Sequence, residues 1–270
     1  MSSRLWTLPL LVAFLIAAGA GTGFAIPSLG GPTGIVAVPN ALVASQDQLQ
    51  TALSYQSMEA AALGMYGTED FTLWGLQALL GVADQAELWG AYSTVSNDDD
   101  SHIWGFGGKV QLAKEPQDQA SLAVGGAYQA WSDAGDLNLW NAYIVVTKDL
   151  TPLGGESWEW SAGAGPQMLG SVGLVYINLD PDVGEDDSLT RPFLGLEFIG
   201  AEGAALGLEY RWKDSDLDDK AVFSAVLRQP VSKDWTVEVG TTNAAPGGIG
   251  LDDQDWFVRV GYNIPLGGAM

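Results

Sequence analysis

Apolar residues recur at every second position in one segment after another from residue 48 onward. Successive side chains of a β-strand point to opposite faces, so each of these segments predicts a strand with one apolar face. The second face carries small, amide or charged side chains. In residues 104–112, for example, the large apolar residues alternate with Gly105, Gly107, Lys109 and Gln111. The pattern predicts an all-β protein.

The spacing of these segments predicts the number of strands. We predict strands at residues 48–57, 70–82, 86–95, 102–112, 119–131, 137–148, 157–180, 191–199, 204–212, 220–229, 235–242 and 256–265. The seventh contains Pro166 and Gly170 and is also compatible with two strands. If it is one strand, a short turn follows the sixth, and short turns alternate with longer or acidic loops, as in bacterial membrane barrels with even strand numbers. The sequence therefore predicts a transmembrane antiparallel up-and-down β-barrel of about twelve strands, with ten or fourteen left open.

The composition of the two faces distinguishes a membrane barrel from a soluble one. A soluble β domain buries its bulky face and exposes its polar face. Here the hydrophilic face carries opposite charges suited to a polar lumen, and tryptophans near strand ends suit the aromatic girdles of outer-membrane barrels. The predicted lumen charges are Lys109, Glu197, Glu209, Arg211, Arg228, Glu238 and Arg259. Charges of opposite sign on adjacent strands favour an internal salt-bridge lattice, with a substrate-selective constriction as the alternative.

The two ends of the chain fit export to the outer membrane. Residues 1–25 have the features of a secretory signal peptide: a positive charge at Arg4, an apolar run, and small residues at the cleavage position. Residues 26–47 are rich in Pro and Gly and predict an ordered coil that can enter the lumen. The barrel is expected at 48–266 and a short tail at 267–270. The predicted location is the cell outer membrane, crossed many times.

The net charge of −22, from 33 acidic and 11 basic residues, excludes nucleic acid as a partner, since phosphate binding needs basic clusters. Most acidic residues fall in or beside the predicted outer loops and form an anionic rim. Asp214, Asp216 and Asp218 have the opening spacing of a calcium loop, but the glycine of position six is replaced by Asp219. The rim predicts either a solvated surface or a weak Ca²⁺ site, and no other cofactor is expected. Lipid and lipopolysaccharide of the outer membrane are the expected partners.

A single histidine, His102, restricts the catalytic chemistry that this chain can perform. A Ser-His-Asp triad would need it, and its place at a loop-to-strand edge beside several aspartates favours a solvated side chain. We therefore predict a non-enzymatic barrel. An outer-membrane hydrolase and a soluble periplasmic ligand-binding barrel are the alternatives.

The segment Pro27-Ser28-Leu29-Gly30-Gly31-Pro32-Thr33-Gly34, with the following Pro39-Asn40-Ala41, resembles the opening of the YjbH-like family of outer-membrane barrels. A second resemblance joins Arg191-Pro192-Phe193-Leu194-Gly195-Leu196-Glu197 to Gly207-Leu208-Glu209-Tyr210, which is similar to paired strands of that family. The resemblance implies a single-barrel version of the family, a link to exopolysaccharide export, and polysaccharide as a partner. The barrel assembly machinery is a further expected partner, as for outer-membrane barrels in general. The expected function is that of a narrow pore or a plugged scaffold.

Overall fold

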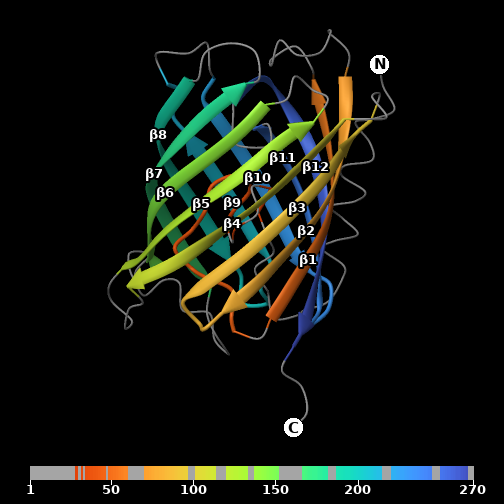
Figure 1. Ribbon diagram of the computed structural model, residues 1–270. Helices are drawn as coiled ribbons and strands as arrows, with labels where there is room; N and C mark the ends of the chain where they lie inside the picture. Colours follow the sequence, from red (N-terminus) through yellow and green to blue (C-terminus); the bar gives the residue numbers. More distant parts are fainter. Residues whose placement is uncertain are drawn as a thin grey trace.

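A computed structural model describes residues 28–29, 32, 34–46, 48–59, 70–96, 101–113, 120–132, 137–151, 166–181, 187–214, 220–244 and 250–266 of the chain. These residues form the strands β1 (Gln48–Glu59), β2 (Asp70–Val82), β3 (Ala86–Val95), β4 (His102–Ala113), β5 (Ala120–Ser132), β6 (Leu137–Asp149), β7 (Gln167–Pro181), β8 (Asp187–Ile199), β9 (Ala205–Arg211), β10 (Val222–Pro230), β11 (Trp235–Ala244) and β12 (Gly250–Pro265). Each strand pairs antiparallel with its neighbours in the chain, and β12 pairs with β1 to close a barrel (Figure 1). The predicted twelve-stranded all-β barrel is confirmed. No helix of the described residues is long and apolar enough to span a membrane.

The chain enters and leaves the barrel at the same rim, because Gln48 at the start of β1 pairs with Pro265 at the end of β12. We call this rim the inner end; in bacterial barrels it faces the periplasm. The opposite rim, where the acidic connections lie, is called the outer end. The β8 and β12 strands extend farther toward the outer end than predicted, since they begin at Asp187 and Gly250 rather than at 191 and 256.

The seventh strand is shorter than predicted. It begins at Gln167, and the connection from β6 spans residues 150–166 instead of a short turn. The neighbouring strand β6 ends at Asp149, so β7 has no partner there for an earlier start. Pro166, which has no N–H to donate, immediately precedes the strand. Most of this connection, including the predicted start of the strand, lies outside the described residues. Connection length alone therefore does not distinguish the two ends of this barrel.

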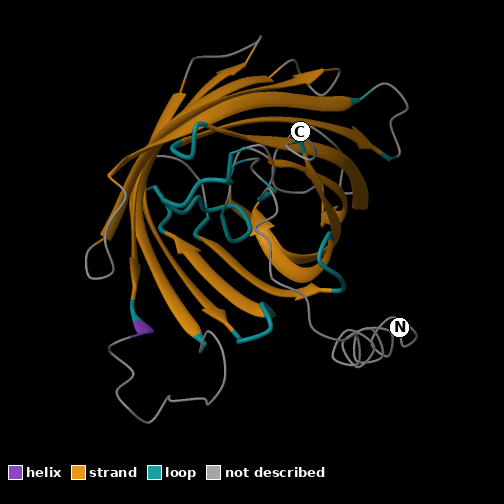
Figure 2. Cartoon of the chain, turned by 90° about the horizontal axis from the view of Figure 1, so that it is seen from below, coloured by secondary structure: helices purple, strands orange, loops and turns teal. Residues whose placement is uncertain are grey.

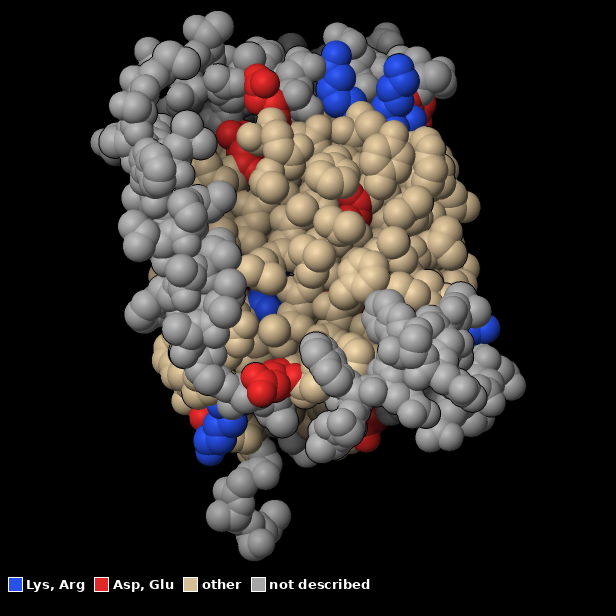
Figure 3. All heavy atoms as spheres, turned by 180° about the vertical axis from the view of Figure 1, so that it is seen from behind, with Lys and Arg blue, Asp and Glu red and all other residues tan. Residues whose placement is uncertain are grey.

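The bulky apolar face of the strands points outward. Large side chains in the middle of strands, such as Leu76 and Phe106, are 59% and 56% exposed. The outward-facing charged residues Lys148 and Asp180 each lie one residue from a strand end. On the face seen in Figure 3, most charged side chains lie toward the two ends of the molecule, and few are seen in the broad band between them. This surface suits lipid, and it contradicts the alternative of a soluble barrel.

Aromatic side chains ring the barrel near its ends. At the outer end Tyr55 packs against Trp74 and Trp256, with ring centroids 4.8 and 5.0 Å apart. At the inner end Trp235 lies 4.5 Å from Tyr262. Exposed tryptophans beside the strand ends are Trp74, Trp104, Trp140, Trp212, Trp235 and Trp256. Five of them lie toward the outer end and form the girdle that the sequence predicts there, Trp235 lies at the inner end, and Trp158 lies outside the described residues.

Candidate functional site: a plug inside the lumen

The segment before β1 lies inside the barrel, as the sequence predicts. We call residues 34–46 the plug. Figure 2 looks along the barrel and shows this coil within the ring of strands. Ile35, Val36, Val38 and Ala41 of the plug are buried.

The tip of the plug is a tight turn closed by a bridge between Gly34 and Pro39. Three successive backbone N–H groups of this turn donate to the carboxylate of Glu209 on β9: those of Val36 at 2.9 Å, Ala37 at 2.9 Å and Val38 at 3.1 Å. Consecutive backbone N–H groups that point inward form a concave anion-binding surface. The tip therefore holds a carboxylate of the barrel wall.

Four charged side chains beside Glu209 form an ion-pair network. Arg228 donates to Glu197 and to Glu238, each at 2.5 Å. Arg259 donates to the other oxygen of Glu238, with its Nε at 2.7 Å. All four side chains are buried, and buried charges are stable only when they are paired. The network also contacts the plug, since Arg228 donates to the carbonyl oxygen of Gly34 at 3.3 Å.

A second group of side chains, on β3 and β4, holds the other half of the plug. Glu87 and Lys109 are fully buried and form an ion pair at 3.0 Å. Glu87 accepts a hydrogen bond from the backbone N–H of Ala44 at 3.0 Å, and Lys109 donates to the carbonyl of Asn40 at 3.0 Å. Nearby, Gln111 donates to the carbonyl of Ala41 at 2.8 Å.

These two groups lie on opposite walls of the barrel. In a closed ring of twelve strands, β3 lies opposite β9, and β4 lies opposite β10. The plug is therefore anchored at both walls and crosses the lumen. The wall side chains bond mainly to the backbone of the plug rather than to its side chains, and residues 34–46 contain no charged residue.

Glycines of the wall make room for the plug. A Cβ atom at Gly207 would lie 2.4 Å from Cγ2 of Ile35, and one at Gly195 would lie 2.6 Å from Cδ1 of Ile35. Toward the inner end, a Cβ at Gly81 would lie 2.0 Å from the carbonyl oxygen of Ser45. Contacts this short essentially never occur for real Cβ atoms, so an alanine at any of these positions would require the plug to shift; at Gly207 the added Cβ would also lie 2.8 Å from Cγ1 of Val226 in the wall.

The lumen is less polar than the sequence predicts. One buried apolar cluster combines Val38 and Ala41 of the plug with inward-facing residues of β5 to β8, namely Ala123, Leu139, Tyr143, Val145, Val175, Ile177, Leu189 and Phe193. Both faces of β6 are apolar, so alternation alone did not identify these residues as interior. The plug explains the difference, because its apolar side chains need apolar partners away from water.

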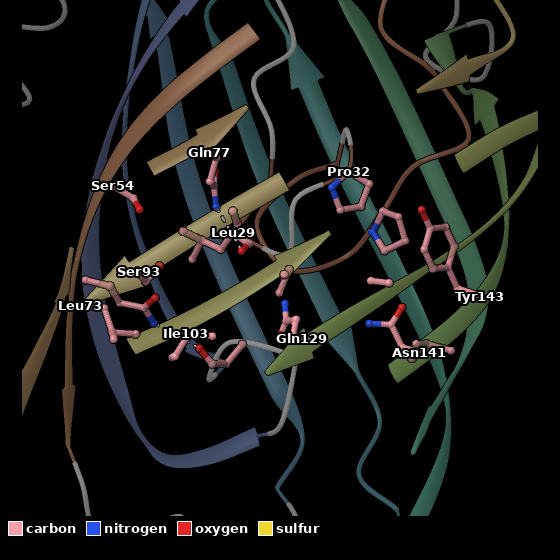
Figure 4. A pocket seen from close by; sticks show the side chains of 18 of the residues that line it. Leu29, Pro32, Ser54, Leu73, Gln77, Ser93, Ile103, Gln129, Asn141 and Tyr143 are labelled. Carbon is pink, nitrogen blue, oxygen red and sulfur yellow. Dashed lines mark hydrogen bonds between the residues drawn. The ribbon is translucent and has the colours of Figure 1, made fainter. Parts of the chain in front are cut away.

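A cavity of about 70 Å³ remains between the plug and the outer end. Residues of the N-terminal coil, including Leu29, Pro32 and Pro39, form one side of it, and strands β2 to β6 form another (Figure 4). The side chains of Gln77, Gln129, Asn141 and Tyr143 point into this space. We call it the outer cavity.

The seven residues predicted to charge the lumen are all buried in the interior: Lys109, Glu197, Glu209, Arg211, Arg228, Glu238 and Arg259. Two further interior charges, Glu87 and Arg191, were missed. Glu87 could have been found from the predicted hairpin, because it pairs in register with Lys109. Arg191 lies on the inward face of β8 with Phe193 and Glu197. Because these residues are separated by even numbers of positions, the predicted inward position of Glu197 also predicts that of Arg191.

The residues considered for metal binding and catalysis lie elsewhere. Asp214 is near the outer end and accepts a hydrogen bond from the backbone of Thr190 at 3.2 Å. Its proposed partners Asp216 and Asp218 fall outside the described residues, and the described part of the chain holds no group of three metal-binding side chains. The calcium site stays a prediction. His102 stacks on Tyr92, with ring centroids 5.8 Å apart.

Comparison with known proteins supports the fold. No family model matches the chain, and no curated protein is similar to it in sequence. Among solved structures, the KdgM porin is similar over 80% of this chain and 98% of its own, with a TM-score of 0.50 and 12% identity. The fold is that of the outer-membrane porins. A KdgM porin in complex with disordered oligogalacturonate has a TM-score of 0.51 at 13% identity, covering 78% of this chain and 98% of that chain. The NanC porin has a TM-score of 0.50 at 11% identity, covering 79% and 98%. The protein is thus a multi-pass outer-membrane barrel, as predicted.

Proposed function

We propose that this protein is a non-enzymatic outer-membrane channel whose lumen is closed by its own plug. The observation that carries the proposal is the attachment of residues 34–46 to two opposite walls, at Glu209 on one side and at Glu87 and Lys109 on the other. Passage through the barrel requires the plug to move.

The pairing of the wall charges favours a movable plug over a permanent core. Glu87 pairs with Lys109, and Glu238 pairs with Arg228 and Arg259, without any help from the plug. If the plug left, these pairs would stay within the wall and face water. Exposing paired charges to water costs little, because water solvates them. The open lumen would then be hydrated and lined by compensated charge on part of its wall and by the apolar residues of β5 to β8 on another part.

Two observations bear on the cargo. The resemblance at residues 27–34 and 191–210 supports a link to surface polysaccharide. A porin of the same fold has been solved with oligogalacturonate. Sugars are therefore the proposed cargo class. The acidic outer rim would repel anions, so uncharged sugars are favoured over acidic ones.

We also propose that the protein has no catalytic activity. His102 stacks on Tyr92 at the start of β4, where an aromatic contact accounts for its position. The rival hypothesis of a hydrolase makes His102 essential. If the protein hydrolyses a phospholipid and His102→Ala abolishes that activity, the non-enzymatic assignment is wrong.

Single-channel recording in planar bilayers tests the channel. We expect the barrel with its plug to stay mostly closed and a deletion of residues 26–46 to give a steady conductance. A deletion of residues 267–270 removes the opposite end of the chain and serves as the matched control, expected to stay closed. Equal conductance of the plugless and intact proteins would refute the proposal.

A further inference from the structure

We infer that the outer cavity is a binding site for a small uncharged ligand rich in hydroxyl groups, such as a single sugar ring or a polyol. The inference deepens the proposed function and rests on it, because it assigns to the closed channel a ligand of the proposed cargo class. The site is formed by the N-terminal coil together with wall residues of β1 to β9 and β11, most of them on β2 to β6 (Figure 4).

Three buried polar atoms that belong to residues lining this cavity have no hydrogen-bond partner within the described part of the chain. They are Oε1 of Gln77, Oε1 of Gln129 and the hydroxyl of Tyr143. Their residues are 5%, 5% and 8% exposed, and all three line the cavity. Buried polar groups in native proteins are almost always hydrogen-bonded, to protein, water or ligand. These atoms therefore define what a ligand in the cavity must offer.

The unsatisfied atoms specify the chemistry of the ligand. An amide oxygen only accepts hydrogen bonds, so Gln77 and Gln129 need donors, while a tyrosine hydroxyl both donates and accepts. A ligand hydroxyl group meets all three requirements. Ser54, Ser93 and Asn141 add neutral polar groups to the lining, which holds no carboxylate among its residues.

The apolar and charged parts of the lining agree with an uncharged ligand. Leu73, Ile103 and Phe193 offer surface for the carbon skeleton of a sugar or polyol. The one cationic side chain of the lining, Arg211, donates to the carbonyl of Ala37 in the plug at 3.0 Å. A negatively charged ligand would also have to pass the acidic outer rim.

The size of the cavity limits the ligand to one small unit. Its volume of about 70 Å³ holds roughly five water molecules. Gln77 also connects the cavity to the coil, because its Nε2 donates to the carbonyl of Leu29 at 3.2 Å while its Oε1 remains available. A ligand bound to Gln77 would therefore contact the wall and the N-terminal coil together.

Ligand titration by saturation-transfer NMR tests the site on the purified mature barrel in detergent. We use D-glucose as the uncharged probe and D-glucuronate as its anionic counterpart. Glucose is expected to bind, and Gln129→Leu is expected to weaken its binding at least tenfold. Tyr143→Phe removes a single oxygen atom and gives a second, less disruptive variant with the same expected direction. Gln50→Leu is the matched control: Gln50 is a buried glutamine with an unpartnered oxygen near the inner end, and it does not line the cavity.

Three results would overturn the inference. They are no glucose binding at all, equal loss of binding in the Gln50 control, and tighter binding of glucuronate than of glucose. The last result would replace the uncharged class by an anionic one. Binding is measured on the closed barrel, so failure to bind glucose would refute the proposed ligand site without refuting the proposed channel function. If the plugless barrel fails to conduct, the proposed channel function is refuted, but a glucose site measured on the closed barrel would still stand.

Discussion

The hydrogen bonds between Glu209 and the plug give the most specific prediction about how the plug stays in the lumen. Its carboxylate accepts hydrogen bonds from three successive backbone N–H groups at the tip. Glu209→Gln keeps the size of the side chain but removes the negative charge and one of the two acceptor oxygens. Hydrogen bonds to a charged group contribute about 1.5–3 kcal/mol each, against about 1 kcal/mol for neutral ones. We therefore expect the substitution to weaken plug attachment by about 2–4 kcal/mol.

A loss of this size changes the ratio of open to closed barrels by about 30- to 700-fold, since about 1.4 kcal/mol corresponds to a factor of ten. The chain has no cysteine, so Ala41→Cys, at a fully buried plug position, provides a clean site for maleimide labelling. Labelling in the Glu209→Gln background should be faster by that factor, and single-channel openings should become frequent.

The matched control is Glu238→Gln. Glu238 is as deeply buried as Glu209, but its hydrogen bonds go to Arg228 and Arg259 rather than to the plug. It should lower the free energy of unfolding and leave labelling of the plug slow. If Glu209→Gln leaves the labelling rate unchanged, or if Glu238→Gln raises it equally, the hydrogen bonds between Glu209 and the tip do not keep the plug in place.

Further predictions concern the fit of the plug and the outer surface. Gly81→Ala places a methyl group where the carbonyl oxygen of Ser45 in the plug lies, so the plug should become accessible to labelling, whereas Gly90→Ala, whose nearest atom would be 3.8 Å away, should have no effect. Ile35→Ala should weaken docking of the plug by about 2–5 kcal/mol, the usual cost of truncating a buried isoleucine, and should therefore speed maleimide labelling of the Ala41→Cys site. Leu76→Arg puts a charge on the lipid-facing surface and should lower the free energy of unfolding by about 2–4 kcal/mol, measured by urea titration in lipid vesicles. An unchanged midpoint would show that Leu76 does not face lipid.

Much of the barrel is readable from the sequence because strand alternation is a local property. The predicted twelve strands, the outward tryptophans and the inward position of Glu209 and Arg259 all follow from counting every second residue. The Pro- and Gly-rich composition before β1 also predicted a coil able to enter the lumen. Pairing partners along the hairpins were equally accessible, although Glu87 was overlooked.

What could not be predicted depends on closure of the barrel. Glu87 and Glu209 both bind the plug from opposite sides only because a closed ring of twelve strands places β3 opposite β9. The start of β7 depends on where its partner β6 ends, at Asp149, and not on its own composition. On β6, Leu139 faces inward and Ile144 outward, and alternation assigns them to opposite faces without saying which face is inside.

Hydrogen–deuterium exchange of the backbone N–H groups of Val36, Ala37 and Val38 tests the central claim most directly. If the tip of the coil is docked on Glu209 across the lumen, these three groups should exchange as slowly as those of the neighbouring strands, and Glu209→Gln should accelerate them. Exchange as fast as that of an unstructured peptide in the intact protein would contradict a plugged barrel.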